Sequence, residues 1–222
     1  MRSLLTCFLP QVLFWLLPWS LRKYCLATFL GFRIGEGARI GYSLIGARAV
    51  EIGDGASIGH LNYIGALDAL RLSRYAVVGH LNWISCSRNI LRGTSAVERS
   101  LNLEEHSGIT NRHLFDCSDK IEVGAFTTVA GWRSQFLTHS IDLRTSIQVT
   151  APIVIGRYCF VGTGVIVLKG AVLPDRCILA AGAVFSKSAN ESWYVYGGVP
   201  AIPIKAIDKT DAYFSRARGW ID

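Results

Sequence analysis

Thr138-His139 and Asp142 are the residues of this 222-residue chain whose types and spacing best fit proton-transfer chemistry. An imidazole titrates near neutral pH, so it can accept the proton of an attacking hydroxyl group and raise the rate by about 10² to 10⁴. A carboxylate can hold the other ring nitrogen. Asp142 is one candidate for that place and Asp116 competes with it. The alternative is that His139 is a surface histidine without a task.

Asn111 stands five residues before Asp116, in the segment Thr110-Asn111-Arg112-His113-Leu114-Phe115-Asp116. By its residue type alone, Asn111 suits a turn as well as a polar contact with another molecule. His113 either lines the same cleft or points inward with its hydrogen bonds satisfied.

These residues lie within a stretch that has a six-residue period. From Ile155 the chain divides into IGRYCF, VGTGVI, VLKGAV, LPDRCI, LAAGAV and FSKSAN. The first residue of every hexad is large and apolar, and the fifth is compact. Neither an α-helix nor an ordinary hairpin sheet has this period. Cys159 and Cys177 occupy fifth places, so we expect small buried fillers rather than disulfide partners.

Similar hexads occur upstream, beginning at Ile34, Ile52, Ile58 and Val123. A short strand followed by a tight corner, when repeated, winds into a prism whose faces are parallel sheets. The first-place side chains then point into the prism, and the glycine that often follows them suits a corner.

One longer internal repeat supports the stacking of coils. The segment 58–64 recurs as 78–84 with the pattern aliphatic-Gly-His-Leu-Asn-aromatic-Ile. We therefore expect two ladders along one edge of the prism: His60 over His80, and Asn62 over Asn82.

The expected organisation has three parts. Residues 1–32 form an apolar helical segment, 33–207 a β-helix domain, and 208–222 a C-terminal tail. Residues 91–120 depart from the hexads, and we expect a loop insertion there. Departures from a repeat are where function is usually added.

The first segment, 1–32, begins with a run of apolar residues that Pro10 interrupts. The run is short for a membrane span, which needs about 20 residues, and no cleavage site typical of a signal peptide follows it. Its tryptophans and the adjacent Arg22-Lys23 favour peripheral contact with a membrane interface. The alternative is that it caps the apolar end of the domain or packs in an oligomer.

Composition narrows the class of protein. Half of the residues are hydrophobic and 18% are charged, which indicates a folded domain rather than a disordered chain. The formal charge is +7, but no long basic run or nucleic-acid motif occurs, so we expect no nucleic acid partner. Six cysteines without a C-x-x-C pair indicate neither a zinc ribbon nor a redox pair, and we expect no metal.

The chain resembles the hexapeptide-repeat acyltransferases in its hexads, in Thr138-His139 and in the final segment GGVPAIPIK at 197–205. The most similar branch is that of the galactoside, maltose and xenobiotic acetyltransferases and their relatives that O-acylate envelope polysaccharides. The resemblance covers about residues 34–207. It implies an all-β fold, a left-handed parallel β-helix, and transfer of an acyl group from acetyl-CoA to a sugar hydroxyl. His139 is then the base, Asn111 an acceptor contact, and the active site forms between subunits of a homotrimer.

The same resemblance implies an acyl-donor groove lined by backbone, small side chains and a cation near the phosphates. The matching residues are Thr163, Ala181, Ser186, Lys187 and Lys205. Thr163 and Ala181 are equally well explained as small corner residues. Ile202 stands where the family pattern has a basic residue, which leaves Lys205, with Lys209 or Arg216, to supply charge.

Other functions remain open on the sequence alone. γ-Type carbonic anhydrases share this fold but need a histidine spacing that His106, His113 and His139 do not provide. A non-catalytic scaffold would tolerate loss of the candidate base. The acceptor is either an envelope or lipid-linked glycan, with the protein cytoplasmic and peripheral on the inner face of the cytoplasmic membrane, or a small soluble sugar or antibiotic.

Overall fold

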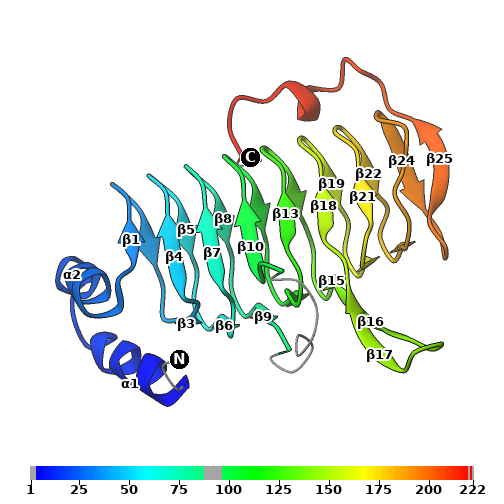
Figure 1. The fold of residues 1–222 in the computed structure, drawn as a ribbon. Coiled ribbons are helices and arrows are strands. Elements are labelled where there is room, and N and C mark those ends of the chain that lie inside the picture. Colours follow the sequence, from blue (N-terminus) through cyan, green and yellow to red (C-terminus); the bar gives the residue numbers. More distant parts are fainter. Residues whose placement is uncertain (1–3, 88–96, 220, 222) are drawn as a thin grey trace.

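In the computed structural model, which describes residues 4–87, 97–219 and 221, the chain winds into a three-faced coil of short parallel strands behind two helices (Figure 1). Each turn of the coil adds one strand to each of three long sheets, called here the first, second and third sheets. In Figure 1 the strands of the first sheet run upward in front, the chain returns behind them, and the coil advances from left to right. The winding is therefore left-handed, and the expected left-handed parallel β-helix is confirmed.

The three sheets take their strands in coil order. The first sheet contains β1 (Arg33–Ile34), β4 (Ala49–Ile52), β7 (Ala69–Leu72), β10 (Ser100–Leu103), β13 (Ile121–Val123), β18 (Ile153–Ile155) and β21 (Val172–Leu173). The second contains β2 (Arg39–Ile40), β5 (Ser57–Ile58), β8 (Val77–Val78), β11 (Gly108–Ile109), β14 (Thr128–Val129), β19 (Phe160–Val161), β22 (Ile178–Leu179), β24 (Tyr194–Gly197) and the antiparallel β25 (Ile202–Ala206). The third contains β3 (Leu44–Gly46), β6 (Tyr63–Gly65), β9 (Trp83–Ser85), β12 (Leu114–Asp116), β15 (Gln135–Leu137), β20 (Ile166–Leu168) and β23 (Val184–Phe185).

Three corners join these sheets, and their names are used throughout. The first corner leads from the first to the second sheet, the second corner from the second to the third, and the third corner from the third sheet to the next coil. Residues that stack on one another at a corner come from successive coils, so a corner is a line of side chains along the molecule.

The core lies inside the coil and is built by the hexads. The first-place residues of the C-terminal hexads are at most 2% exposed: Ile155, Val161, Val167, Leu173, Leu179 and Phe185. The compact fifth places Cys159 and Cys177 are also buried, and both are free thiols. The periodicity thus predicted the interior correctly.

Both expected ladders are present at the second corner. The rings of His60 and His80 stack with their centroids 5.4 Å apart. The Nδ2 of Asn82 donates to Oδ1 of Asn62 at 3.0 Å. Side-chain ladders of this kind satisfy the polar backbone of a corner that has no strand pairing.

The region 91–120 differs from the expectation. Residues 100–116 form a complete regular coil (β10, β11 and β12), and the part of the expected insertion at 91–96 lies outside the described residues. The buried residues Leu103, Ile109 and Phe115 keep the six-residue spacing. The hexads were hidden because Glu104, Thr110 and Asp116 stand where glycine usually follows the core aliphatic.

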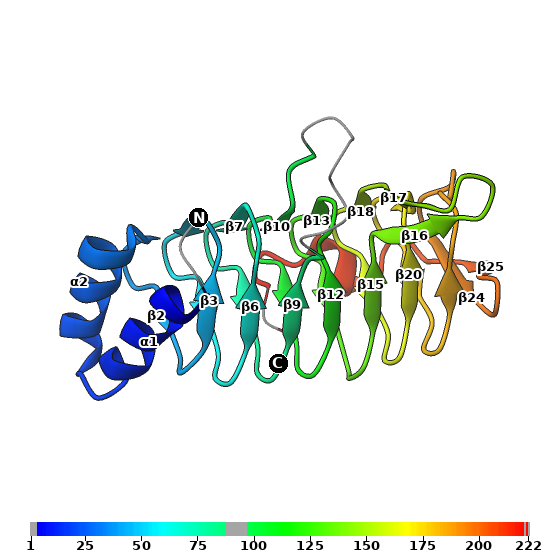
Figure 2. The same ribbon diagram turned by 60° about the horizontal axis from the view of Figure 1, so that its bottom comes forward.

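Two coils contain more residues than the others. Leu72 pairs with Leu103 and Val123 with Ile155, so the chain between these partners is much longer than the 18 residues from Ile34 to its partner Ile52. In the second of these coils the additional residues form an antiparallel hairpin, β16 (His139–Asp142) and β17 (Ile147–Thr150), which projects from the third corner (Figures 1 and 2).

The N-terminal helices α1 (Leu4–Phe14) and α2 (Trp19–Leu30) cover the open end of the coil (Figure 2). Pro18 separates them, and Gly31 ends α2 in a left-handed conformation that directs Phe32 into the core. No described helix is long and apolar enough to span a membrane.

One polar side chain from the helices meets the first coil at or directly after the first strand of each sheet. Gln11 both donates to the carbonyl oxygen of Ile45 (2.8 Å) and accepts from its N–H (3.0 Å), as a neighbouring strand would. Arg22 donates to the carbonyl oxygens of Ile40 and Gly41, and Lys23 to that of Gly35. These contacts satisfy backbone groups of the first coil that have no preceding coil to pair with.

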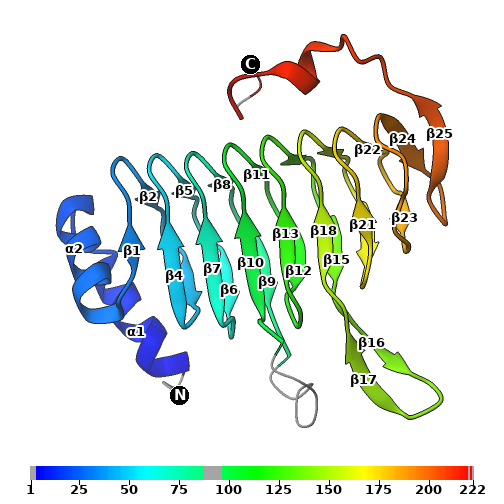
Figure 3. The same cartoon turned by 45° about the horizontal axis from the view of Figure 1, so that its top comes forward.

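The C-terminal tail returns along the first corner (Figure 3). Its short 3₁₀-helix, Ala212–Ser215, precedes Arg216, whose guanidinium lies over the rings of Tyr158 and Tyr213. The tail covers a stack of rings from successive coils, of which Phe126 and Tyr158 are 4.7 Å apart.

Candidate active site

His139 and Asp116 meet at the third corner. Strands β12 and β15 pair with Asp116 opposite Leu137, so Thr138-His139 follows directly beside the carboxylate. The Nδ1 of His139 donates to Oδ2 of Asp116 at 2.5 Å. The carboxylate comes from the preceding coil, and the imidazole from the residue that begins the projecting hairpin.

The Asp116 carboxylate is held in place by other groups. Oδ1 accepts from the hydroxyl of Ser118 (2.6 Å), and Oδ2 also accepts from the N–H of Thr138 (3.1 Å). The Thr138 hydroxyl donates to the Asp116 carbonyl oxygen at 2.7 Å. The Asp116 side chain is 12% exposed, so this network is largely shielded from water.

This arrangement leaves one ring nitrogen available. A carboxylate can only accept, so it places the proton of the neutral imidazole on Nδ1 and leaves the lone pair on Nε2. The His139 side chain is 37% exposed, and Nε2 has no hydrogen-bond partner within the described part of the chain. An oriented imidazole with a free, accessible Nε2 is what a general base requires.

Asp142 does not hold this imidazole. Its Oδ1 accepts from the backbone N–H groups of Arg144 (2.8 Å) and Thr145 (3.3 Å) and so fixes the turn of the hairpin. Side chains alternate along a strand, so His139 and Asp142, three residues apart on β16, lie on opposite faces of it. The sequence left two carboxylates as candidates for the partner of His139, and in the structure this partner is Asp116.

Asn111 lies at the second corner, away from His139 in the same chain. It precedes β12, whereas Asp116 ends that strand, so the two residues lie at opposite edges of the third sheet. Oδ1 of Asn111 accepts from the N–H of His80 at 2.7 Å and continues the histidine ladder. Within one chain Asn111 has the turn-forming role.

His113 points inward beside Asn111. Its Nδ1 accepts from the N–H of Ser134 (3.1 Å), Nε2 lies 2.9 Å from the Thr110 hydroxyl, and the residue is 2% exposed. Burial lowers the pKa of His113 to about 4. It is therefore neutral at ordinary pH and belongs to the ladder rather than to a cleft.

Two of the expected acyl-donor contacts share the second corner. Thr163 and Ala181 are exposed and come from successive coils, and the N–H of Gly182 donates to the Thr163 carbonyl oxygen at 2.9 Å. The Thr163 hydroxyl oxygen also accepts from the N–H of Trp132 at 2.9 Å. These small residues lie across the third sheet from His139.

The cations expected to contact the donor phosphates lie in different parts of the coil. Ser186-Lys187 follows β23 at the third corner, two strands along the sheet from β15, whereas Lys205 lies on β25 at the C-terminal end of the second sheet. Lys209 and Arg216 lie over aromatic rings of the first corner. Of the predicted cations, Lys187 alone shares a corner with His139.

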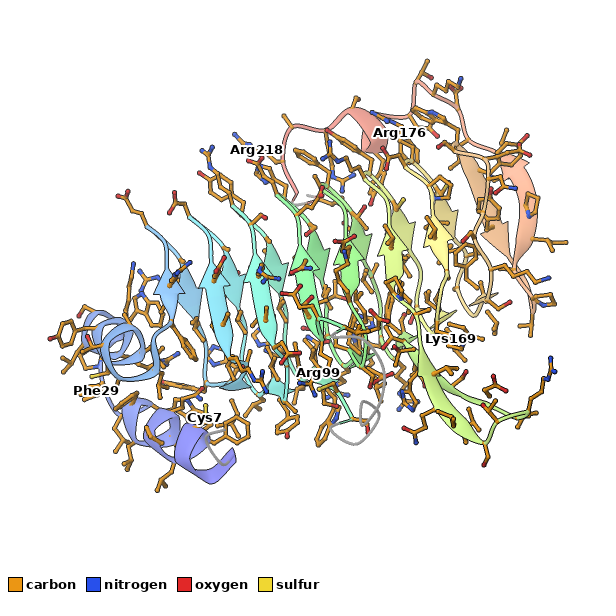
Figure 4. The ribbon with its side chains drawn as sticks, viewed as in Figure 1. Cys7, Phe29, Arg99, Lys169, Arg176 and Arg218 are labelled. Atoms are coloured by element: carbon orange, nitrogen blue, oxygen red, sulfur yellow. The ribbon has the colours of Figure 1, made fainter. Side chains whose placement is uncertain are left out.

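Lys169 is a further cation at this corner. It follows β20, between the coils of His139 and Lys187, and the N–H of the next residue, Gly170, donates to the carbonyl oxygen of Pro152 at the end of the hairpin. Figure 4 shows Lys169 beside the base of the hairpin. Neither Lys169 nor Lys187 forms an ion pair with a described residue.

The three histidines considered for a zinc site lie at different corners. His106 stacks between rings at the first corner, His113 belongs to the second and His139 to the third. One chain therefore does not bring them together. Among the described residues no group of three potential ligands converges.

Comparison with solved structures identifies the fold. A scan of protein-family models finds no match, and a search of curated proteins finds no matching sequence. The polysialic acid O-acetyltransferase OatWY superimposes with a TM-score of 0.53 and 17% identity over 82% of this chain and 98% of that chain. The hexapeptide-repeat acetyltransferase VCA0836 of Vibrio cholerae, complexed with acetyl-CoA, gives 0.52 and 19% over 63% and 72%.

This is the fold of the hexapeptide-repeat acetyltransferases. A second structure of VCA0836 covers 94% of this chain and 95% of its own, with a TM-score of 0.50 and 14% identity. The resemblance predicted from the hexads is confirmed for the fold. At these identities the likeness concerns the hexapeptide-repeat fold, and the chemistry depends on this chain's own residues.

Proposed function

We propose that the protein is an acyltransferase that moves an acyl group, most simply acetyl, from acyl-CoA to a sugar hydroxyl. The observation that carries the proposal is the Asp116-held imidazole of His139, whose Nε2 is accessible beside a projecting hairpin. A hydroxyl is a weak nucleophile until a base removes its proton.

The proposed reaction uses His139 twice. Nε2 takes the proton of the acceptor hydroxyl as the new C–O bond forms at the thioester carbonyl. His139 then returns this proton to the departing sulfur as the C–S bond breaks, so the imidazole ends neutral. Asp116 stabilises the imidazolium that exists between the two transfers. Lys169 and Lys187 supply positive charge for the donor phosphates.

A polysaccharide or lipid-linked glycan is the proposed acceptor. Support comes from OatWY, a polysialic acid O-acetyltransferase in which nearly the whole chain matches this fold.

We also propose that neighbouring copies complete the site in a trimer. The outward face of the third sheet carries exposed Trp83 and Leu114, and the adjoining second corner exposes Leu61, Leu81 and Trp132. Such an apolar face favours association. Because it lies between His139 at one corner and Thr163 and Ala181 at the other, a second copy packed there would bring the two halves together.

The activity test uses purified protein, labelled acetyl-CoA and glycan acceptors. The wild type should transfer label into an ester that mild alkali releases, and His139→Ala should lower the rate by about 10² to 10⁴. His106→Asn is the matched control, because His106 lies at the first corner and asparagine tolerates its positive φ. Near wild-type transfer by His139→Ala would exclude the proposed base, and an alkali-stable amide product would exclude O-acylation.

The shared site is tested by mixing two inactive variants. His139→Ala and Ala181→Trp damage opposite halves of the proposed site. If subunits of a trimer assemble at random, about one quarter of the interfaces contain both intact halves, so mixing should restore about one quarter of wild-type activity. A mixture as inactive as its components, or a monomeric active wild type, would exclude the shared site.

A further inference from the structure

The two N-terminal helices present apolar side chains to the outside. Leu9, Val12, Leu13 and Leu16 are exposed along α1 and the turn after it, and Leu21 and Tyr24 are exposed on α2. Leu16 is 86% exposed. Within the described side chains of the two helices, no exposed residue is charged.

This is the reverse of an ordinary surface helix, which turns charged and polar residues to water. The reversal has a clear cause, since Gln11, Arg22 and Lys23 are used to cap the three sheets. The cations expected from the sequence to meet a membrane thus point into the protein. What remains outside is an uncovered apolar face, a feature that marks interaction sites.

Basic residues lie beside this face. Residues 1–48 contain six Lys or Arg and one acidic residue, Glu36, and two of the six, Arg22 and Lys23, are used as caps inside the protein. Arg33 and Arg39 are exposed on the first coil directly behind the helices. Arg39 lies beside α2, with its guanidinium carbon 5.9 Å from the Trp19 ring centroid, while Arg33 also pairs with Glu51 at 3.2 Å.

The basic residues beside the apolar face distinguish between two possible partners for it, a second copy of the chain and a lipid surface. A second copy docked cap to cap would bring two identical basic rims together, and like charges across an interface are costly. An anionic lipid surface accepts leucine side chains among its acyl chains and basic residues among its headgroups. We propose that the outward face of α1 and α2 docks on an anionic membrane surface, with the helices lying in the interface. This inference does not depend on the proposed acyl transfer.

The experiment is co-sedimentation of the full chain with phosphatidylcholine vesicles that contain or lack phosphatidylglycerol. The wild type should bind the anionic vesicles, and added salt should weaken the binding. Leu13→Ser with Leu16→Ser keeps every capping side chain and should bind at least about tenfold more weakly. Leu143→Ser is the matched control, because Leu143 is 90% exposed at the hairpin turn and should leave binding unchanged.

A second variant tests the charge separately. Arg33→Gln with Arg39→Gln should weaken binding to anionic vesicles by about fivefold for each charge and reduce its salt dependence. Circular dichroism should show the same fold for all variants. Undiminished binding by the leucine double variant would overturn the proposal.

The competing occupants give different results. If the face belongs to a second copy, sedimentation velocity will show a larger wild-type assembly that the leucine double variant dissociates, without vesicle binding. If it belongs to another protein, neither vesicle binding nor self-association will occur. Either result overturns the membrane proposal.

Discussion

The carboxylate of Asp116 accepts the Nδ1 proton of His139 from an adjacent coil, although the two residues are 23 positions apart in the sequence. Asp116 therefore acts through the imidazole. It fixes the tautomer and the ring orientation, and in the proposed reaction it is a positioning residue rather than a group that meets the substrate.

Replacing Asp116 with asparagine should lower kcat by about 10²-fold with little change in KM, because the imidazolium loses its counter-charge and the tautomer is no longer fixed. Asp142→Asn should change kcat by less than about twofold, since asparagine retains the oxygen that holds the hairpin turn. Steady-state kinetics of the two variants shows which carboxylate orients the imidazole. A larger loss in Asp142→Asn would assign the orienting role to that residue instead.

Lys169→Gln and Lys187→Gln should each raise the KM for acyl-CoA by about five- to tenfold and leave kcat within about twofold, because a cation near a phosphate contributes binding more than chemistry. The effect should shrink at high salt. Lys120→Gln is the control, since Lys120 already pairs with Glu122 at 2.7 Å. Equal effects in all three variants would show a general loss of charge rather than a phosphate contact.

His113 should make stability depend on pH. Its pKa is lowered to about 4 by burial, from an ordinary value of 6.5, so between these values the unfolded chain binds more protons than the folded protein. The free energy of unfolding should therefore fall as the pH decreases from about 6.5 to about 4, by up to about 3 kcal/mol from this residue, and this contribution should change no further below that.

Urea denaturation across this pH range measures the effect. His113→Asn is the matched variant, because Asn82 occupies the same position one coil earlier and accepts from the N–H of His113. It should show a smaller loss of stability on acidification than the wild type. Identical slopes would mean that His113 does not titrate with unfolding.

Gln11→Leu should destabilise the protein by about 2 kcal/mol, because the N–H and the carbonyl oxygen of Ile45 would both lose their partner in a buried place. Ser20→Ala, at an exposed position of α2, should be nearly neutral. Chemical denaturation gives the free energies, and hydrogen exchange should show faster exchange at the Ile45 amide. An unchanged exchange rate would argue against the cap.

The fold could be predicted because its determinants are local. A first-place aliphatic, a compact fifth residue and a corner recur within six positions, so Ile155 and Cys159 already indicate which side chains face inward. The coil of β10 to β12 was less visible, since Glu104 and Thr110 occupy corners where glycine marks other coils. The six-residue spacing of its buried residues was the signal that could have predicted this coil.

The candidate site was harder to predict from the sequence, because its contacts join residues of different coils. Nothing near His139 in the sequence distinguishes Asp116 from Asp142; the stacking of β12 on β15 does. Lys169 was overlooked inside the hexad VLKGAV, although a lone charge in an apolar repeat was a usable signal. Asn111 matched a spacing in the family, but the second corner separates it from His139 within one chain.

The three side chains that close the N-terminal end of the coil also oppose its growth into a larger assembly. A solenoid has no internal reason to stop, because every coil offers the same row of amides and carbonyls to the next. Gln11, Arg22 and Lys23 occupy the row that another chain would otherwise extend. They close this end of the coil, and they keep a discrete particle from becoming the first segment of a fibre.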